Sequence, residues 1–321
     1  MAEIDSRLQA LAVQALPEWE LADAHLEPIG ISENATFRVD TPDKQYVLRI
    51  HRPGYHTFTE LESEHVWTAA LRKAGLDVPV PAQTRGGHVY LTLPFEAEER
   101  HIDMLEWVDG ELLGNIIQQE SGCFAGHFRA TGRIAAAMHN QSSAWTLPSG
   151  FERQSFDIEG LMGDDPFWGP FWDLPQMSKA QRDVIMSARR TITEQLMCLG
   201  YSPETFSLIH ADLHPHNLVV SDHGLHVIDF DDCGFGWHHY ELAVALYRYR
   251  ELDRYEDMLA SMVDGYREVR PLSETVVAML PVFYLVRSLV HLGWSAARPE
   301  HGKDLSDSIE HTVRQAREWM G

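Results

Sequence analysis

The sequence has little of several features that mark particular classes of protein. Only three cysteines, Cys123, Cys198 and Cys233, occur among 321 residues. Their odd number and the lack of a C-x-x-C pair argue against a disulfide framework and favour a reducing compartment. The first residues, Met1–Asp5, are acidic and lack the apolar core of a secretion signal. The longest apolar run, Val276–Val286, is shorter than the about 20 residues of a membrane span, so we expect a cytoplasmic protein without a membrane partner.

Positive charge is also scarce. The chain has 26 Lys and Arg residues against 48 Asp and Glu residues, which gives a net charge of −22. Binding to nucleic acid depends on basic contacts, so this balance argues against a nucleic-acid partner. An acidic surface could attract a cationic substrate, but more often it only keeps a protein soluble. The length and the 44% of hydrophobic residues allow one large or two medium globular domains.

The most informative segment of the chain is a predicted β-hairpin. Leu218–Val220 and Leu225–Ile228 read as two short strands, and Ser221–Gly224 between them is a polar turn that ends in glycine. A hairpin brings the residues at its open end together. The side chains that flank these two strands are therefore expected to act at one place.

Three polar residues lie at that open end or shortly before it. Asn217 precedes the first strand and Asp229 follows the second, so the hairpin brings two oxygen ligands towards each other. Such ligands suit Mg²⁺, which is octahedral and is usually shared with substrate phosphates. Asp212 lies five residues before Asn217 and can accept the proton of an attacking hydroxyl group. The pattern predicts phosphoryl transfer, with Asp212 as the catalytic residue and Asn217 and Asp229 as metal ligands.

The same segment resembles the catalytic core of the aminoglycoside phosphotransferase and choline kinase superfamily, distant relatives of protein kinases. His210, Asp212 and Asn217 match its catalytic-loop pattern, and Asp229 matches its metal-binding Asp. The resemblance covers about residues 26–294. It implies an α+β, two-lobed, kinase-like fold, transfer of the γ-phosphoryl group of ATP to a hydroxyl, and Mg²⁺ as the metal. It also implies that His210 braces the catalytic loop by a hydrogen bond to the backbone near Asp229.

The order of sequence patterns fits two lobes of different composition. Residues 1–108 read as a small β-rich nucleotide-binding lobe with a leading helix, and residues 109–321 as a larger, mainly helical lobe that carries the hairpin and the acceptor site. In the small lobe we expect an amphipathic helix from Ile4 to Ala15, strands at Thr36–Val39 and Gln45–Ile50, a helix at Thr59–Ala74 that stops at Gly75, and two short strands on either side of Arg85–His88.

The resemblance assigns nucleotide contacts in the small lobe. Arg49 lies where the family has a Lys that contacts the phosphates, and Glu64 on the following helix lies where its ion-pair partner is expected. Arg keeps the positive charge and can contact phosphate bidentately, although its geometry differs from that of an ammonium group. Ser32 and Asn34 lie in the loop between the first two strands and could hold phosphate oxygens together with backbone N–H groups. This loop lacks the G-x-G-x-x-G pattern of protein kinases.

The segment Met104–Gly110 is expected to connect the lobes, because an apolar strand that ends in Asp-Gly suits a hinge. Adenine would contact the backbone around Glu106 to Val108. Backbone contacts leave little trace in side-chain identity, so this assignment follows from position alone.

The histidines near the hairpin raise a zinc hydrolase as an alternative. His210 and His214 have the i, i+4 spacing of helical metal ligands, but Pro215 and the strand that follows argue against a helix. Neither an H-E-x-x-H motif nor a cysteine ligand accompanies them. We therefore expect His214 and His216 to be ordinary residues at the edge of the site.

Other residues near the motifs allow two interpretations each. Trp168, Trp172 and Trp237 could form an apolar or cation-binding wall for the acceptor, or could seal the helical core. Asp231 and Asp232 could assist the metal or attract an acceptor amine, or could form a solvated acidic edge.

The identity of the acceptor is left open by these motifs. Gly265–Ser273 resembles a segment of homoserine kinases, whereas Ser32–Asn34 and Arg49–Pro53 are similar to bacterial stress-response protein kinases of the same fold. No long activation segment with an A-P-E motif follows Asp229, so we favour a small hydroxyl acceptor such as an amino alcohol, a homoserine-like or an aminoglycoside-like compound. A protein Ser/Thr acceptor is the alternative. A nucleotide-binding pseudokinase is a third possibility, because Arg49 replaces the expected Lys.

Overall fold

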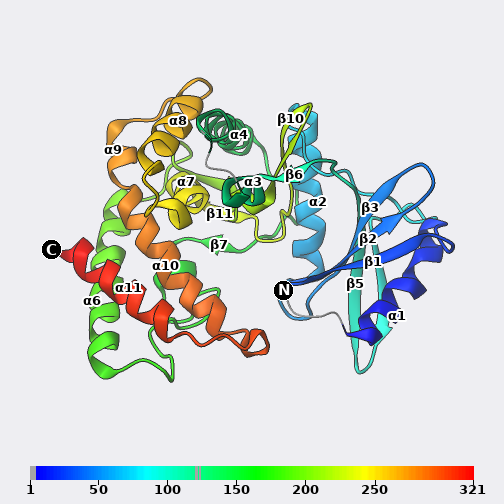
Figure 1. Cartoon of the computed structure of the whole chain (residues 1–321), viewed down its shortest axis with the longest axis horizontal. Helices are drawn as coiled ribbons and strands as arrows, with labels where there is room; N and C mark the ends of the chain where they lie inside the picture. Colours follow the sequence, from blue (N-terminus) through cyan, green and yellow to red (C-terminus); the bar gives the residue numbers. More distant parts are fainter. Residues whose placement is uncertain (1–4, 120–121, 123) are drawn as a thin grey trace. The chain divides into compact units, whose positions relative to one another are not determined.

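The computed structural model of the chain describes residues 5–119, 122 and 124–321. Ile4 of the expected first helix and Cys123 lie outside these residues. The chain divides into two compact units, drawn in Figure 1. The first unit contains Met1–Gly110 and Gly150–Glu152, and the second contains Glu111–Ser149 and Arg153–Gly321.

The first unit is built on a five-stranded antiparallel sheet with the strand order β1-β2-β3-β5-β4. Two helices, α1 (Ser6–Ala15) and α2 (Phe58–Lys73), lie on opposite sides of these strands (Figure 1). A short 3₁₀ helix, η1 (Leu16–Trp19), follows α1. The strands are β1 (His25–Ile31), β2 (Ala35–Asp40), β3 (Gln45–Ile50), β4 (Tyr90–Phe95) and β5 (Glu98–Glu106).

The alternation of side chains along β3 and β5 decides what each face of this sheet carries. Leu48 of β3 and Met104 of β5 are register partners, and both are buried in the cluster that contains the apolar residues of α1. Successive side chains of a strand point to opposite faces. The next register pair, Arg49 and Asp103, therefore faces the other side of the sheet, where α2 lies.

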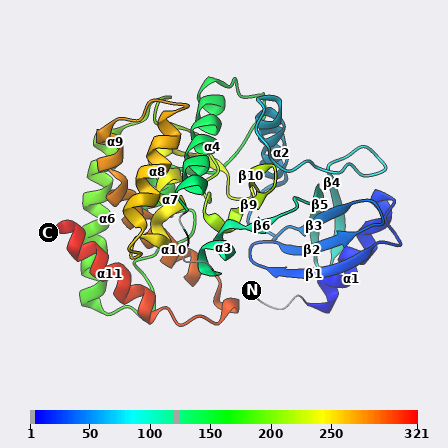
Figure 2. The same ribbon diagram turned by 45° about the horizontal axis from the view of Figure 1, so that its top comes forward.

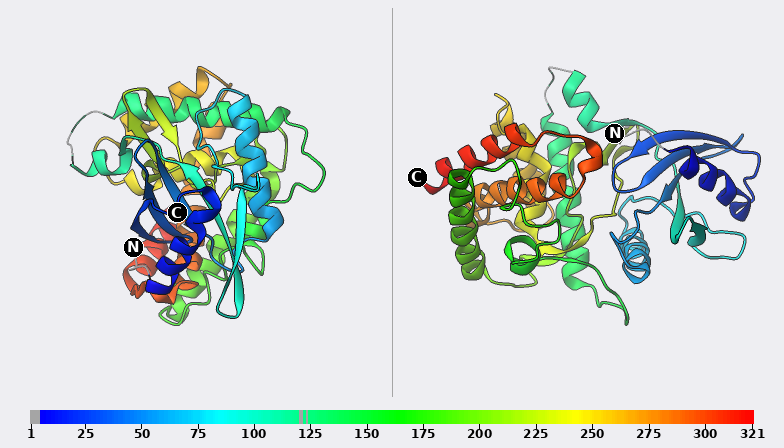
Figure 3. Two further views of the ribbon diagram at one scale, coloured as in Figure 1. Left: turned by 90° about the vertical axis from the view of Figure 1, so that its right-hand side faces the viewer. Right: turned by 90° about the horizontal axis from the view of Figure 1, so that it is seen from below.

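The second unit is mainly helical. Helices α4 and α8 run alongside each other (Figure 2), and α6 and α11 lie side by side in Figures 1 and 2. Figure 3 shows α11, in red, beside α10, in orange. The helices are α3 (Leu113–Gln119), α4 (Ala125–Ala144), α5 (Ile158–Met162), α6 (Lys179–Leu199), α7 (His238–Leu246), α8 (Tyr255–Arg267), α9 (Glu274–Ala278), α10 (Leu280–Ala296) and α11 (Ser306–Met320), with 3₁₀ turns η2 (Pro215–Asn217), η3 (Tyr247–Tyr249) and η4 (Pro299–His301).

None of the helices in the described ranges is both long enough and apolar enough to cross a membrane.

Two small sheets are set among these helices. One has the order β10-β9-β6 and contains the predicted hairpin, in which Ser221 is paired with Gly224 across the turn. The other has the order β7-β11-β8, and the sequence pattern did not predict it because its strands are only two to four residues long and no hairpin turn joins them. The strands are β6 (Glu111–Leu112), β7 (Ser155–Phe156), β8 (Phe206–Ile209), β9 (Leu218–Ser221), β10 (Gly224–Val227) and β11 (Gly234–Trp237).

Most of the elements expected in the small lobe are confirmed. The strands at residues 36–39 and 45–50 are β2 and β3, and the expected helix is α2. This helix begins with a capping box formed by Thr57 and Glu60. The prediction of a strand before Arg85 is wrong, because that segment forms only an isolated β-bridge between Pro81 and Leu105. Proline has no backbone N–H to give to a strand ladder.

Candidate active site

Asp212 lies in the loop between β8 and η2, and three side chains hold it in place. Asn217 Nδ2 donates to the Asp212 backbone carbonyl (2.9 Å) and to its Oδ2 (3.1 Å). Arg287 Nη2 donates to Oδ1 at 2.5 Å, and His214 Nε2 lies 3.3 Å from Oδ2. A carboxylate has roughly four lone-pair sites, so these contacts leave room for a further donor. The Asp212 side chain keeps 18% of its surface exposed, which makes that place accessible to a small molecule.

The charges around Asp212 keep it ionised. Burial alone would raise its pKa, but His214, Arg287 and His210 act against burial, and the resulting pKa lies below the ordinary value. Burial also lowers the pKa of His214, although the neighbouring Asp212 acts in the opposite direction. A carboxylate in this setting is a weak base but a well-oriented acceptor. That suits a loose phosphoryl-transfer transition state, in which positioning matters more than base strength.

Arg287 of α10 is the partner of Asp212 that the sequence interpretation missed. Its side chain is only 8% exposed, and Nη1 donates to the Tyr240 hydroxyl at 3.1 Å. Its guanidinium carbon lies 5.5 Å from the ring centre of Trp168 and 5.6 Å from that of Tyr247. A buried cation is costly unless it is paired. A lone Arg inside the apolar α10 sequence was therefore the signal that a buried anion lies nearby.

Asn217 and Asp229 lie at the open end of the β9–β10 hairpin. The N–H of Ile228 donates to the Asn217 backbone carbonyl at 3.0 Å, which places the start of the Asp229 segment next to Asn217. The Asn217 Nδ2 donates to Asp212, so the Oδ1 atom of Asn217 is the one that could bind a metal ion. Asp229 is exposed and has a left-handed backbone with φ of 64°. One amide oxygen and one carboxylate fit a hard divalent cation that takes its other ligands from phosphate and water.

The histidines of this region have local partners. His210 Nε2 lies 3.0 Å from the carbonyl oxygen of Ile228, which is the bracing contact next to Asp229 that the resemblance implied. His214 contacts Asp212. His216 Nε2 lies 3.3 Å from the side-chain nitrogen of Gln118.

Glu241 of α7 holds the catalytic loop through its backbone. The N–H groups of His210 and Ala211 donate to Oε1 and Oε2 of Glu241, each at 2.8 Å. Ala211 has a φ of 65°, a left-handed conformation that costs a residue with a side chain about 1–2 kcal/mol. A typical hydrogen bond between uncharged groups contributes about 0.5–1.5 kcal/mol, so the two bonds together offset this cost. The residue that follows this turn is Asp212.

Burial makes the carboxyl group of Glu241 an unusually weak acid. Its side chain is fully buried, and burial raises its pKa to about 8, although the two backbone N–H groups oppose the rise. Nε2 of His139 lies 4.0 Å from Glu241, and the His139 ring stacks on His238 at 3.9 Å. Burial lowers the pKa of both histidines, so neither supplies a counter-charge. The sequence interpretation missed Glu241, although a carboxyl group within an apolar helix was a visible signal.

A second brace holds the segment that follows Asp229. Arg153 donates through Nε to the Cys233 carbonyl at 2.6 Å and also to the carbonyl of Asp231. Gln154 Nε2 donates to the Asp232 carbonyl at 2.9 Å. The Asp231 side chain is 4% exposed, so it does not belong to a solvated acidic edge.

In the first unit, Arg49 forms the ion pair with Glu64 that the resemblance implied. Nη2 of Arg49 lies 2.9 Å from Oε1 of Glu64, and both side chains are at most 5% exposed. Arg49 has a second, closer partner that was not foreseen. Its Nε and Nη2 donate to Oδ1 and Oδ2 of Asp103 at 3.0 and 2.6 Å. Nε2 atoms of His51 and His65 lie 3.2 and 3.0 Å from the same two oxygens.

Arg49 and Asp103 keep their charges in this buried group. Burial opposes ionisation of Asp103, but Arg49, His51 and His65 outweigh it and hold the pKa of Asp103 well below its ordinary value. The pKa of Arg49 is raised well above its ordinary value, because Asp103 and Glu64 outweigh the effect of burial. Arg49 and Asp103 therefore remain a charged pair at ordinary pH.

The two loop candidates for phosphate contact differ in availability. Ser32 is exposed in the turn between β1 and β2. Asn34 is 7% exposed, and its Oδ1 accepts the N–H of Arg52 at 3.3 Å. Asn34 therefore ties the turn to the end of β3, which leaves its amide nitrogen and the neighbouring backbone for a ligand.

The candidates for adenine contact lie at and after the end of β5. The Glu106 side chain pairs with Lys44 at 2.9 Å, and its N–H donates to the Val80 carbonyl at 2.8 Å. Val108 lies in the irregular stretch that follows and is partly buried. A nucleotide contact from this segment would therefore use a carbonyl group or the backbone of Val108 rather than the Glu106 N–H.

The three tryptophans considered as an acceptor wall have different surroundings. Trp168 lies against Arg287, the partner of Asp212. Trp172 instead stacks on Arg189 of α6, with 4.0 Å between the guanidinium carbon and the ring centre. Trp237 is fully buried in the core. Of the three, the contacts connect Trp168 to the catalytic loop.

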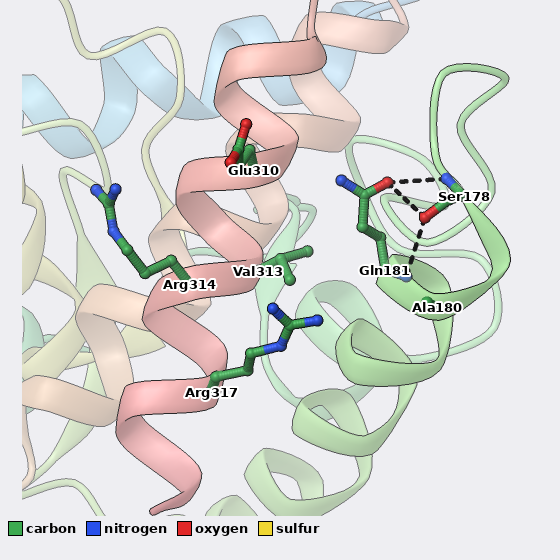
Figure 4. Close-up of a pocket in the computed structure, with 7 residues that line it drawn as sticks. All are labelled: Ser178, Ala180, Gln181, Glu310, Val313, Arg314 and Arg317. Atoms are coloured by element: carbon green, nitrogen blue, oxygen red, sulfur yellow. Dashed lines mark hydrogen bonds between the residues drawn. The ribbon is translucent and has the colours of Figure 1, made fainter.

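A pocket of about 430 Å³ lies elsewhere in the second unit, between the start of α6 and α11 (Figure 4). Ser178 and Gln181 line it, but their side chains are paired with each other in the capping box of α6. Arg314 and Arg317 of α11 are exposed at its edge. None of the residues proposed from the sequence lines this pocket, so it contributes nothing to the site around Asp212.

The raised pKa of Glu241 leads to a prediction about stability. A carboxyl group whose pKa rises from 4.5 to about 8 on folding stabilises the folded state fully below pH 4.5. This contribution is lost as the pH rises to about 8. Glutamine cannot ionise, so the difference in unfolding free energy between wild type and Glu241→Gln should fall between pH 5 and pH 9. Urea denaturation of both proteins at pH 5, 7 and 9 measures it, and a difference independent of pH would contradict the assignment.

Known proteins with related sequences and structures show which family the chain belongs to. Residues 25–272 match the family model described as the phosphotransferase enzyme family. The structure of a microcompartment-associated aminopropanol kinase is 34% identical, with a TM-score of 0.83 over 96% of this chain and 94% of that one. An amicoumacin kinase solved in complex with AMP-PNP, Ca²⁺ and Ami is 19% identical, with a TM-score of 0.75 over 98% and 93% of the two chains.

A curated relative agrees with these likenesses. The amicoumacin kinase of Bacillus subtilis is 22% identical over 285 residues, which cover 82% of this chain and 77% of that protein. The family model covers more than half of the chain. The solved structures that resemble the chain are small-molecule kinases with the expected α+β kinase-like fold. The chain therefore belongs to the phosphotransferase enzyme family and is a kinase.

Proposed function

We propose that this kinase transfers the γ-phosphoryl group of ATP to the hydroxyl of a short amino alcohol, with Mg²⁺ as its metal. The observation that carries the proposal is the Asp212 carboxylate, which is fixed by Arg287 and Asn217 and is still 18% exposed. The 34% identity to an aminopropanol kinase supports an amino alcohol as the acceptor. The likeness to small-molecule kinases favours such an acceptor over a protein side chain. The proposal includes a cytoplasmic location, because the reaction consumes ATP.

Each candidate residue has a role in this proposal. Asp212 orients the acceptor hydroxyl and receives its proton. Asn217 and Asp229 hold Mg²⁺, which when bound would offset the charge of the β- and γ-phosphates. The proposed nucleotide contacts are Arg49, Glu64, Ser32, Asn34, Glu106 and Val108.

The reaction needs little covalent chemistry from the protein. The acceptor hydroxyl donates a hydrogen bond to Asp212. Its oxygen forms a bond to the γ-phosphorus while the bond from that phosphorus to the bridging oxygen breaks, and ADP leaves with the bonding electrons. The hydroxyl proton passes to Asp212. Arg287 keeps Asp212 ionised and oriented beforehand, so that positioning supplies most of the rate enhancement.

The net charge of −22 is consistent with a cationic acceptor. An acidic protein surface raises the local concentration of small cations and speeds their association, an effect that salt screens.

The proposal is tested by measuring ADP formation with ATP, Mg²⁺ and a panel of acceptors. The panel contains 1-amino-2-propanol, ethanolamine, choline, homoserine, an aminoglycoside and casein. We expect the largest kcat/KM with a short amino alcohol, and we expect Asp212→Asn to lower kcat about 10²-fold or more while nucleotide binding survives. Preference for casein, or near-normal turnover in Asp212→Asn, would contradict the proposal.

Arg287 should affect turnover rather than nucleotide affinity, because its contact is with Asp212. We expect Arg287→Ala to lower kcat about 10- to 100-fold with little change in the Kd for an ATP analogue. Arg287→Lys should recover part of the lost kcat, because lysine keeps the positive charge but lacks the planar group of donors of a guanidinium.

Arg189→Ala is the matched control for Arg287→Ala. Like Arg287, Arg189 stacks on a tryptophan, Trp172, and donates to a carboxylate, that of Asp164. Its partners are therefore residues other than Asp212. Its kcat should stay close to that of the wild type. An equal loss in both variants, measured by steady-state kinetics, would reduce Arg287 to a packing role.

A further inference from the structure

We propose that Asp103 is a positioning residue for nucleotide binding, because it orients Arg49 so that one edge of the guanidinium stays available for a phosphate. This inference rests on the proposed function and deepens it. It assigns a role to a residue of β5 that neither the sequence motifs nor the catalytic loop involves. It also explains how an Arg can serve where the family expects a Lys.

The hydrogen bonds of Arg49 are distributed unevenly over its three nitrogens. Nε and Nη2 donate to the two oxygens of Asp103, and Nη2 also meets Glu64. Nη1 is buried and has no hydrogen-bond partner among the described residues. A buried donor without an acceptor costs about 1–3 kcal/mol. Such groups are rare in native structures and call for an explanation, and an acceptor supplied by a ligand is one.

Glu64 alone cannot set the orientation of Arg49. It contacts the guanidinium through Oε1 only, and its Oε2 has no hydrogen-bond partner among the described residues. A single contact to one nitrogen lets the planar group rotate. Two parallel bonds to Asp103 fix the plane, and Nη1 then points away from both Asp103 contacts.

Asp103 is itself held rigidly. It is fully buried, and each of its oxygens is shared between a nitrogen of Arg49 and a ring nitrogen of a histidine. Because Arg49 and Asp103 are register partners on adjacent strands, the backbone ladder fixes the spacing between them.

Charge balance does not account for the second carboxylate. Arg49 brings one guanidinium to this group, whereas Glu64 and Asp103 bring two carboxyl groups. An ion pair of one Lys or Arg with Glu64 alone would have no net charge. Geometry explains the second carboxyl group. A planar guanidinium needs a bidentate partner to keep its third nitrogen, Nη1, directed away from the carboxyl groups, whereas an ammonium group does not.

A lysine at position 49 should therefore not substitute for Arg49 while Asp103 is present. Its single nitrogen would be drawn between Asp103 and Glu64, with no N–H directed to a phosphate. Removing the charge of Asp103 should free that lysine to pair with Glu64 alone. The two positions should thus be coupled, and the effects of the two substitutions should not add.

The test compares the wild type with Arg49→Lys, Asp103→Asn and the double variant. Calorimetry with a non-hydrolysable ATP analogue and Mg²⁺ gives Kd, and thermal unfolding gives Tm for each protein. We expect each single substitution to weaken binding about tenfold or more, as loss of a charge-assisted contact does. The double variant should bind several-fold more tightly than Arg49→Lys. Arg85→Lys changes an exposed Arg of the same unit that pairs with Glu18 and should leave Kd unchanged.

The possible outcomes separate this inference from the function it rests on. Kd values within twofold of the wild type, with lowered Tm, would show that the cluster only supports the fold and would overturn the inference. Additive losses without any regain in the double variant would also overturn it. If Asp103→Asn alone does not fold, the comparison of Arg49→Lys with the double variant still decides. Absence of nucleotide binding by the wild type would overturn the proposed function, and this inference with it.

Discussion

The catalytic loop depends on one buried carboxylate. Glu241 accepts the N–H groups of His210 and Ala211 on its two oxygens, and so holds Ala211 in a left-handed conformation directly before Asp212. From this fixed start, Asp212 meets Arg287 of α10 and Asn217 of η2. The position of the Asp212 carboxylate therefore follows from a backbone contact that is independent of any substrate.

The first unit uses the same principle for a cation. Arg49 is fixed by Asp103, as Asp212 is fixed by Arg287, and in both cases the partner comes from a different element. Charged groups that are oriented before the substrate arrives require no reorganisation during the reaction, which is the basis of electrostatic catalysis. The cost of burying these charges is offset by several donors for each carboxylate.

Local sequence signals explain why the hairpin could be predicted. Strand-forming residues flank a polar turn ending in Gly224, and both strands form there. The ion pair of Arg49 with Glu64 was inferred from the family pattern and is present. In contrast, β7, β8 and β11 lie far apart in the sequence, so no short turn between them marks a hairpin.

The residues that hold the candidate site could not be predicted in the same way. Asp103 lies 54 residues from Arg49, Glu241 lies 30 residues from Ala211, and Arg287 lies 75 residues from Asp212. Their pairing depends on which elements become neighbours, such as β3 beside β5. The sequence shows only that an ionisable residue interrupts an apolar stretch, as Glu241 and Arg287 do. Such a residue indicates a buried partner but does not identify it.

In the proposed reaction, the β9–β10 hairpin and the Asp212 loop that precedes it bring together the metal and the acceptor hydroxyl. A crystal structure of the enzyme with an ATP analogue, Mg²⁺ and an amino alcohol tests this most directly. We expect the metal on Asn217 Oδ1 and the Asp229 carboxylate, and the hydroxyl oxygen within about 2.6–3.2 Å of an Asp212 oxygen. A metal bound without Asp229, or a hydroxyl directed away from Asp212, would contradict the account.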